Sequence, residues 1–163
     1  MSKDQLSRRT ALVGLALAPG AALAAETPAT DEVRAALLQF LSAFENCDLA
    51  AMEAGFAEDA LTFDPTLMSR EGTPKIDAEE FRRKTGMSPA MRRICTSALK
   101  SGAKPPYVSV KPLDLSIQMG ADMAVCSFHL ESQGRLARRT TVLAKRSGAW
   151  KIIHLHASNV QIA

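Results

Sequence analysis

Asp64 is the residue of this sequence best suited to acid–base chemistry. It ends an apolar run that is typical of a short helix followed by a strand, and Pro65 comes directly after it. A carboxylate at the end of a buried strand can act as a general base, because burial raises its pKa toward the working pH. Asp-Pro is also a common opening of a turn. The sequence leaves both interpretations open, a proton-transferring base in a small pocket or the first residue of a loop.

Arginine and histidine side chains further along the chain are candidates for stabilising negative charge on a ligand bound beside such a base. Arg138 and Arg139 are adjacent, so in a strand they point to opposite faces, and one of them can enter a pocket. The alternative for these arginines is a solvated outer face. A guanidinium in an apolar pocket selects a carboxylate or an enolate through bidentate hydrogen bonds. His154 and His156 share a face with each other and with Trp150, either in the pocket or at an interface. Which face lines the pocket stays open, because the turn before this strand can shift the register by one residue.

The histidines and cysteines are not spaced as a metal site. His154 and His156 give two ligands at strand spacing, with His129 on another predicted strand, whereas zinc needs three or four converging ligands. The cysteines form no CxxC pair and stand among apolar residues, where a free thiol packs as a small hydrophobe. We therefore expect no metal, no cofactor and at most one disulfide bond. The three cysteines are Cys47, Cys95 and Cys126.

Residues 1–24 are predicted to be a twin-arginine export signal. Arg8 and Arg9 precede an uncharged run that is too short for a transmembrane helix, and small residues at 22–24 offer a cleavage site. The protein would then be periplasmic or secreted, with no stable membrane insertion after cleavage. Removing 24 of the 163 residues leaves 139, enough for one domain. Cleavage also removes three basic side chains and one acidic one, so the net charge falls from +3 to +1. A charge this small does not indicate nucleic-acid binding.

The remaining sequence predicts helices first and strands afterwards. After a leader at residues 25–30, Thr30 or Asp31 is expected to cap a helix whose apolar residues recur to Phe44. Asp48 is expected to cap a second short helix that has Phe56 on its buried side. This order predicts an α+β domain over residues 31–160, with N-terminal helices wrapped by a curved, cone-shaped antiparallel sheet. The further expected elements are a strand at 60–63, a helix at 77–84, a segment at 91–99 left open between helix and strand, and strands at 108–117, 123–131, 136–146 and 150–158.

Two segments resemble the nuclear transport factor 2-like (NTF2-like) superfamily, which includes ketosteroid isomerases and SnoaL-like cyclases. Residues 56–65, FAEDALTFDP, resemble its acidic strand ending in Asp-Pro, and residues 70–72 resemble the following arginine-x-glycine. Residues 148–158 are similar to its closing strand, in which a tryptophan precedes a His-x-His-x-Ser pattern. The likeness extends over about residues 31–159. It implies a cystatin-like cone, and a homodimer formed through the sheet.

The resemblance implies that Asp64 is the proton-shuttling aspartate of the isomerases. Their tyrosine donor falls on Phe40 and their neutral carboxylic acid falls near Val142, and neither side chain can donate a hydrogen bond. An oxyanion without preorganised donors loses much of its stabilisation, so steroid isomerisation is disfavoured.

The expected function is therefore a small-molecule pocket in an exported SnoaL-like domain, with or without catalysis. As an enzyme it would perform cofactor-free isomerase, cyclase or lyase chemistry on a small hydrophobic carbonyl compound that can carry an anionic group. The alternative is a non-catalytic domain for ligand binding or oligomerisation. The expected catalytic residues are Asp64, Arg139, His154 and His156. The expected ligand-contacting residues are Phe40, Phe44, Phe63, Phe81, Arg138 and Trp150.

Overall fold

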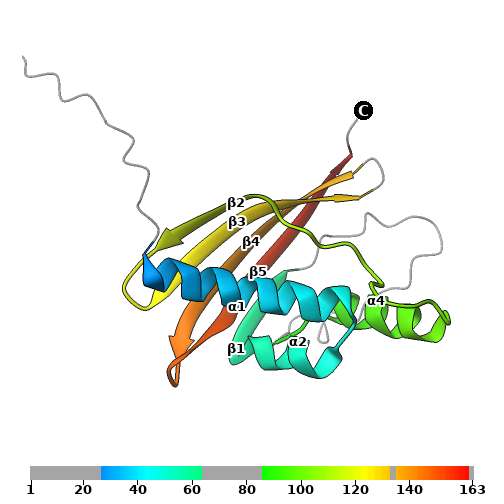
Figure 1. Ribbon diagram of the computed structural model, residues 1–163, viewed down its shortest axis with the longest axis horizontal. Coiled ribbons are helices and arrows are strands. Elements are labelled where there is room, and N and C mark those ends of the chain that lie inside the picture. The colour runs from blue at the N-terminus through cyan, green and yellow to red at the C-terminus, as the bar shows by residue number, and fades with distance from the viewer. Residues whose placement is uncertain (1–26, 64–85, 133–134, 162–163) are drawn as a thin grey trace, which may run out of the picture.

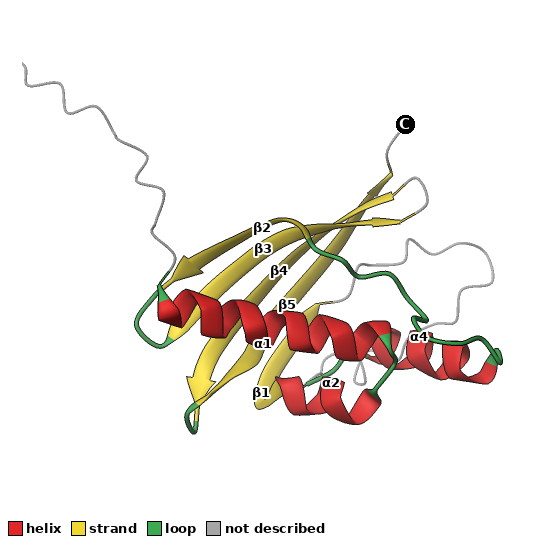
Figure 2. Ribbon diagram, in the orientation of Figure 1, coloured by secondary structure: helices red, strands yellow, loops and turns green. Residues whose placement is uncertain are grey.

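A long helix crosses one face of a curved sheet in this computed structural model, as Figures 1 and 2 show. The structure describes residues 27–63, 86–132 and 135–161. In chain order the elements are α1 (Pro28–Glu45), α2 (Leu49–Gly55), β1 (Phe56–Phe63), α4 (Pro89–Lys100), β2 (Leu113–Met119), β3 (Met123–Ser132), β4 (Arg135–Arg146) and β5 (Ala149–Gln161).

The described strands form one mixed sheet in the order β1-β5-β4-β3-β2. Strands β2 to β5 form an antiparallel meander, and β1 adds to β5 in parallel. This confirms the predicted α+β class, except that β1 makes the sheet mixed rather than purely antiparallel. Strand β2 begins at Leu113 and not at Val108, because Pro112 has no N–H to offer a sheet partner.

Helix α1 begins earlier than the sequence predicts. Thr27 is the N-cap instead of Thr30 or Asp31, and its Oγ1 accepts a hydrogen bond from the Thr30 N–H at 3.3 Å. Pro28 occupies the first turn, where a missing N–H is not needed. The expected leader therefore loses its last three residues to the helix. The buried residues of α1 are Val33, Leu37, Phe40, Leu41 and Ala43.

Helix α2 is capped as predicted, since the Asp48 carboxylate accepts a hydrogen bond from the Ala51 N–H at 3.0 Å. Phe56 does not end this helix but begins β1, and its ring meets that of Phe40 edge-on at 5.2 Å. Gly55 lets the two rings approach here, because a Cβ at this position would lie 3.1 Å from the Phe40 ring and the ring would have to shift. The strand consequently starts four residues before the predicted Ala60.

The segment at 91–99 is helical and belongs to α4. Ser88 caps this helix by accepting a hydrogen bond from the Met91 N–H at 3.1 Å, and Pro89 fills the first turn. This pair is a helix-start signal that the sequence interpretation did not use. The helix expected at 77–84 lies outside the described residues.

Strand β5 carries a bulge that reverses its alternation. Its register changes from Leu143 opposite Ile152 to Val142 opposite His154, which leaves Ile153 without a directly opposite residue. One extra residue exchanges the faces of all side chains beyond it. Ile152 is therefore buried on the α1 side, whereas His154 points to the opposite face.

Trp150 does not share a face with His154 and His156, so that prediction is wrong, and the bulge is the reason. Its indole N–H donates to Glu32 of α1 at 3.1 Å, and the Lys145 ammonium reaches the same carboxylate at 3.1 Å. The hydrogen bond from Trp150, reinforced by Lys145, lowers the pKa of Glu32 below its ordinary value. These contacts tie the start of α1 to the β4–β5 hairpin.

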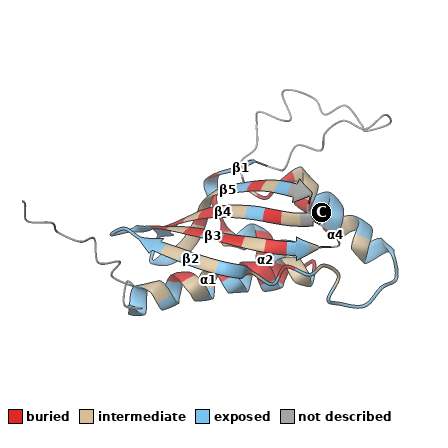
Figure 3. Ribbon diagram, turned by 90° about the horizontal axis from the view of Figure 1, so that it is seen from above, coloured by how far each residue is buried: buried red, intermediate tan, exposed pale blue. Residues whose placement is uncertain are grey.

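The core lies between α1 and the sheet. Figure 3 shows buried residues along the central strands and on the sheet side of α1, whereas the outer side of α4 is exposed. The largest fully buried apolar side chains are Leu37, Met52, Leu143, Ile152 and Val33. In the part of the chain that the structure describes, no helix is long and apolar enough to cross a membrane.

Candidate functional site

The core face of β4, which looks toward α1, carries one arginine of the predicted pair. Arg139 lies directly opposite Phe128 and Ala157, and both of these are buried, at 4% and 5% exposed. Residues directly opposite each other in a sheet share a face. The Arg139 Nη1 donates to the backbone carbonyls of Arg138 at 2.9 Å and Ser158 at 3.2 Å, so the guanidinium is held at a defined place. Arg138 belongs to the opposite face.

Thr141 lies two residues from Arg139 on the same face of β4, and the sequence interpretation missed it. Its side chain is fully buried, and its Oγ1 has no hydrogen-bond partner among the described residues. A buried hydroxyl without a partner costs about 1–3 kcal/mol, so such groups are usually satisfied. Thr62 and Thr141 both lie opposite Leu155 of β5, one on each side of it. Unlike the Thr141 hydroxyl, the Thr62 hydroxyl has a partner, because it donates to the Gly86 carbonyl at 2.7 Å. The Thr141 hydroxyl is thus a buried polar group whose hydrogen-bonding capacity the described residues leave unused.

A second guanidinium approaches this face from α1. Cys126 lies opposite Thr141, and burial raises the pKa of its thiol to about 11, although Arg34 of α1 acts in the opposite direction. Arg34 is therefore close enough to Cys126 to favour negative charge there. The thiol stays protonated at neutral pH, which makes Cys126 a core residue and no nucleophile. Arg139 on β4 and Arg34 on α1 are thus the two guanidinium groups that we associate with this face.

The predicted histidines lie on the other face of the sheet. His154 and His156 stand opposite Val142 and Thr140, and the ring of Phe63 contacts both imidazoles edge-on, at 5.3 and 6.4 Å. The structure consequently does not bring His154 or His156 together with Arg139. We call this side of the sheet, which carries Leu61, Phe63, His154 and His156, the open face.

His129 and Arg138 are directly opposite each other on this open face as well. The His129 Nδ1 lies 3.3 Å from a carboxylate oxygen of Asp114, which is exposed. The three histidines do not converge, and within residues 27–63, 86–132 and 135–161 no group of three or more His, Cys, Asp or Glu side chains could hold a metal ion.

The predicted apolar wall residues likewise do not all lie on one face of the sheet. Phe40 is buried on the face of α1 that meets the sheet, and Phe44 of the same helix packs partly buried against the core, so both are on the side of Arg139. Phe63 is 55% exposed on the open face. Trp150 is paired with Lys145, six residues along β4 from Arg139, which corresponds to about 20 Å. Phe40 and Phe44 are thus the two predicted wall residues that the described structure places on the same side of the sheet as the candidate site.

Two predicted site residues, Asp64 and Phe81, lie outside the described residues, as does the arginine-x-glycine segment at 70–72. Asp64 directly follows Phe63, the last residue of β1. Its role as a base stays a prediction.

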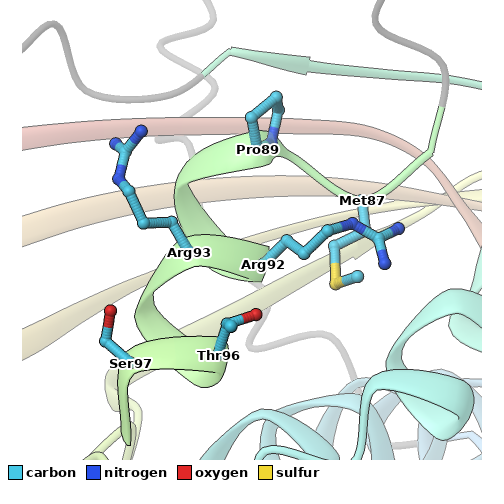
Figure 4. Close-up of a pocket in the computed structure, with 6 residues that line it drawn as sticks. All are labelled: Met87, Pro89, Arg92, Arg93, Thr96 and Ser97. Atoms are coloured by element: carbon cyan, nitrogen blue, oxygen red, sulfur yellow. The ribbon is translucent and has the colours of Figure 1, made fainter. Parts of the chain in front are cut away.

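A separate hollow of about 370 Å³ lies against α4. Figure 4 shows that the side chains of Arg92 and Arg93 extend in different directions along its border. Arg92 forms an ion pair with Glu53 of α2. The two guanidinium groups thus do not converge on one ligand, and we favour the core face as the site. The hollow is lined by Met87, Pro89, Arg92, Arg93, Thr96 and Ser97.

Comparisons with solved structures identify the same fold in several proteins. An NTF2-like protein of unknown function from Pseudomonas putida is 21% identical, with a TM-score of 0.57, over 82% of this chain and 87% of that one. A candidate dehydratase of the NTF2-like family from Streptomyces avermitilis is 21% identical, with a TM-score of 0.55, over 82% and 99%. The CaMKII hub homology domain from Chlamydomonas reinhardtii is 20% identical, with a TM-score of 0.53, over 82% and 99%.

At these identities the solved structures establish the NTF2-like, cystatin-like fold and no particular activity. Among curated proteins, no sequence matches this chain. The family model described as SnoaL-like domain matches residues 33–163, a range that contains every described strand and most of α1. The chain therefore belongs to the SnoaL-like domain family.

Proposed function

We propose that the protein binds a small carbonyl compound with an anionic group between α1 and the core face of β4, and moves a proton on it. The observation that carries this proposal is the placement of Arg139 and Thr141 two residues apart on one face. The first supplies a positive charge and the second a buried hydroxyl without a described partner. Few polar groups in an otherwise apolar site are typical of small-molecule binding.

Each group has a distinct role in the proposed reaction. Arg139 pairs with the carboxylate or enolate of the ligand, and its bonds to backbone carbonyls fix the position of the guanidinium. Thr141 donates a hydrogen bond to the carbonyl oxygen. Asp64, the residue that follows β1 in the sequence, accepts the proton from the carbon beside the carbonyl. An isomerase, a cyclase or a lyase can begin with this step, and the candidate dehydratase of the same fold fits the lyase version.

The direct test is an exchange assay that requires no knowledge of the final product. The full chain is mixed in D₂O with small 2-oxo acids and enolisable ketones, and ¹H NMR follows the loss of the proton beside the carbonyl. We expect exchange above the buffer rate for at least one acid, and slower exchange for the matching neutral ketone. Uniform background rates throughout the panel would count against catalysis and favour binding alone.

Arg139→Met is expected to weaken binding of the anionic compound by about 10–100-fold, since a hydrogen bond to a charged group contributes about 1.5–3 kcal/mol. Methionine keeps much of the apolar stem, so the change removes mainly the charge. Titration calorimetry measures the dissociation constant. Arg138→Met is the matched control, because the neighbouring side chain belongs to the open face. Equal losses in both variants would place the ligand elsewhere.

Assembly through the open face is the second candidate function. Leu61 and Phe63 are 49% and 55% exposed there, next to His154 and His156. An exposed apolar group of this kind is typical of an interaction surface, and the resemblance implies a homodimer. Sedimentation should then give the mass of a dimer, and Phe63→Lys should give a monomer. Leu38→Lys on α1, where Leu38 is 42% exposed, is expected to leave the dimer intact.

Export by the twin-arginine route is part of the proposal. Its support is the sequence of residues 1–24, which lie outside the described part of the chain. The protein should be found in the periplasmic fraction with Ala25 as its first residue. Replacing Arg8 and Arg9 by lysine should retain it in the cytoplasm, whereas periplasmic recovery of that variant would argue for another route.

A further inference from the structure

The three histidines of the chain, His129, His154 and His156, all lie on the open face of the sheet. Imidazole is the side chain whose charge ordinarily changes between pH 5 and 8. The charge of the open face therefore changes in this range of pH.

Two neighbouring rows of side chains cross the open face and hold His154 and His156. Each row contains one side chain from each of the five described strands, and the histidine is its only titratable member. The row of His154 is Leu61, His154, Val142, Val125 and Gln118, and the row of His156 is Phe63, His156, Thr140, Ser127 and Ser116. The ring of Phe63 contacts both imidazoles, and no residue within the described ranges forms a hydrogen bond or an ion pair with either of them.

Charged side chains flank these two rows without offering the imidazoles a counter-ion. Arg138 lies one row beyond, and Lys151 comes earlier on β5, where its ammonium donates to a backbone carbonyl of α2 at 2.6 Å. Both of these side chains are cations. On β1, Glu58 and Asp59 are exposed, and Asp59 forms an ion pair with Arg146 at 3.7 Å. Once protonated, the two imidazoles must therefore keep water as their partner.

The open face is complementary to a second copy of itself. Leu61 and Phe63 expose apolar surface on one side of it, and the other side carries charges of both signs, namely Arg138, Glu131 and Asp114. In a two-fold contact the same surface lies on both copies, so a cation of one copy can meet an acid of the other. A partner with charges of one sign would meet a like charge on this face. An apolar area beside a polar rim is also typical of a protein interface.

We propose that the open face joins two copies of this chain only while His154 and His156 are neutral, so that pH controls the assembly. This inference rests on the second candidate function, assembly through the open face, and adds its regulation. In the dimer each copy excludes water from the two rows of the other. A charged imidazole buried there without a counter-ion is costly, so association releases the protons of these side chains. The dissociation constant of the dimer consequently rises as the pH falls through the range in which histidine titrates.

His129 differs from the other two histidines because a carboxylate lies beside it. Its Nδ1 is 3.3 Å from the Oδ2 of Asp114. Asp114 adopts a positive φ of 53°, at the irregularity of the β2–β3 pairing between Leu113 and Ser116. Protonation of His129 strengthens this ion pair and leaves no unpaired charge on the open face. His129 is therefore the matched control for the other two.

The test measures the dissociation constant of the full chain by sedimentation over a range of concentrations at pH 7.5 and at pH 5.5. Four imidazoles per dimer release protons, and each proton can change the constant by about tenfold per pH unit. We expect dissociation at pH 5.5 to be at least about 100-fold stronger, with an unchanged circular dichroism spectrum that excludes unfolding. A dimer of equal or greater stability at pH 5.5 would overturn the pH control and leave the assembly intact. A monomer at both pH values would overturn the assembly itself, and the pH control with it.

Variants of the three histidines give the second readout. A protein with both His154→Gln and His156→Gln should remain a dimer at pH 5.5, with a dissociation constant within about threefold of its value at pH 7.5. Each single variant should retain about half of the change on a logarithmic scale. His129→Gln should retain all of it. A pH dependence that survives in the double variant, or that is lost in His129→Gln, would refute the assignment to His154 and His156.

Discussion

Leu37→Ala is expected to lower the free energy of unfolding by about 2–5 kcal/mol, the largest stability loss that we predict for a single substitution. Leu37 is completely buried in the face of α1 that meets the sheet. Alanine removes apolar contacts and leaves a cavity, because α1 is tied at its start by the Glu32 contacts and cannot move freely onto the sheet. Urea denaturation followed by circular dichroism measures the change through its midpoint.

Leu38→Ala is the matched control for this prediction. Leu38 is the next residue of the same helix but is 42% exposed, so the same change should cost less than about 1 kcal/mol. The comparison cancels helix propensity, since both variants exchange leucine for alanine in the middle of α1. Similar losses at Leu37 and Leu38 would show that α1 does not pack on the sheet with the described face.

Asp64→Asn is expected to reduce the rate of proton exchange by about 10²–10⁴-fold, the usual contribution of a general base. Asparagine has nearly the same shape but cannot accept the proton, so the ligand should still bind. The exchange assay in D₂O measures the rate, and titration calorimetry measures the affinity. Unchanged affinity with lost exchange would assign Asp64 to the chemical step and not to binding.

Asp59→Asn is the control for charge. Asp59 lies in the same strand, β1, but is exposed and forms an ion pair with Arg146 at 3.7 Å. The Asp59→Asn substitution removes the same carboxylate charge without changing a residue of the proposed site, so the exchange rate should stay within a factor of about two. If Asp64→Asn leaves the exchange rate as little changed as Asp59→Asn does, the hypothesis of a non-catalytic domain is favoured.

The meander could be predicted from the sequence because its turns are marked. Ser147 and Gly148 adopt positive φ values of 49° and 82° in the β4–β5 hairpin, and glycine and serine are typical of such turns. The strands on either side consequently begin within a residue or two of their predicted positions. The parallel pairing of β1 with β5 carries no comparable local mark, since it joins residues far apart in the sequence.

The candidate site was predicted only in part, and the reasons are local. The alternation of side chains along a strand predicts that Arg138 and Arg139 point to opposite faces. Only the pairing of Arg139 with Phe128 shows that Arg139 is the one that faces α1. The bulge at Ile153 has no sequence signal, so the faces of Trp150 and the histidines could not both be assigned. Thr141 was missed because a threonine in a strand is ordinary, and only the absence of a described partner singles it out.

The place of β5 between β1 and β4 has a consequence for the order of folding. Among the described strands β5 is the one that pairs with β1, and Phe63 stands opposite His156, 93 residues later in the sequence. During synthesis β1 therefore cannot pair with β5 until almost the whole domain has been translated. Contacts so distant in sequence make folding slow, and they make it a step that follows translation. A ribosome-bound fragment that ends before residue 149 would leave β1 and β4 with exposed edges, open to chaperones or to aggregation.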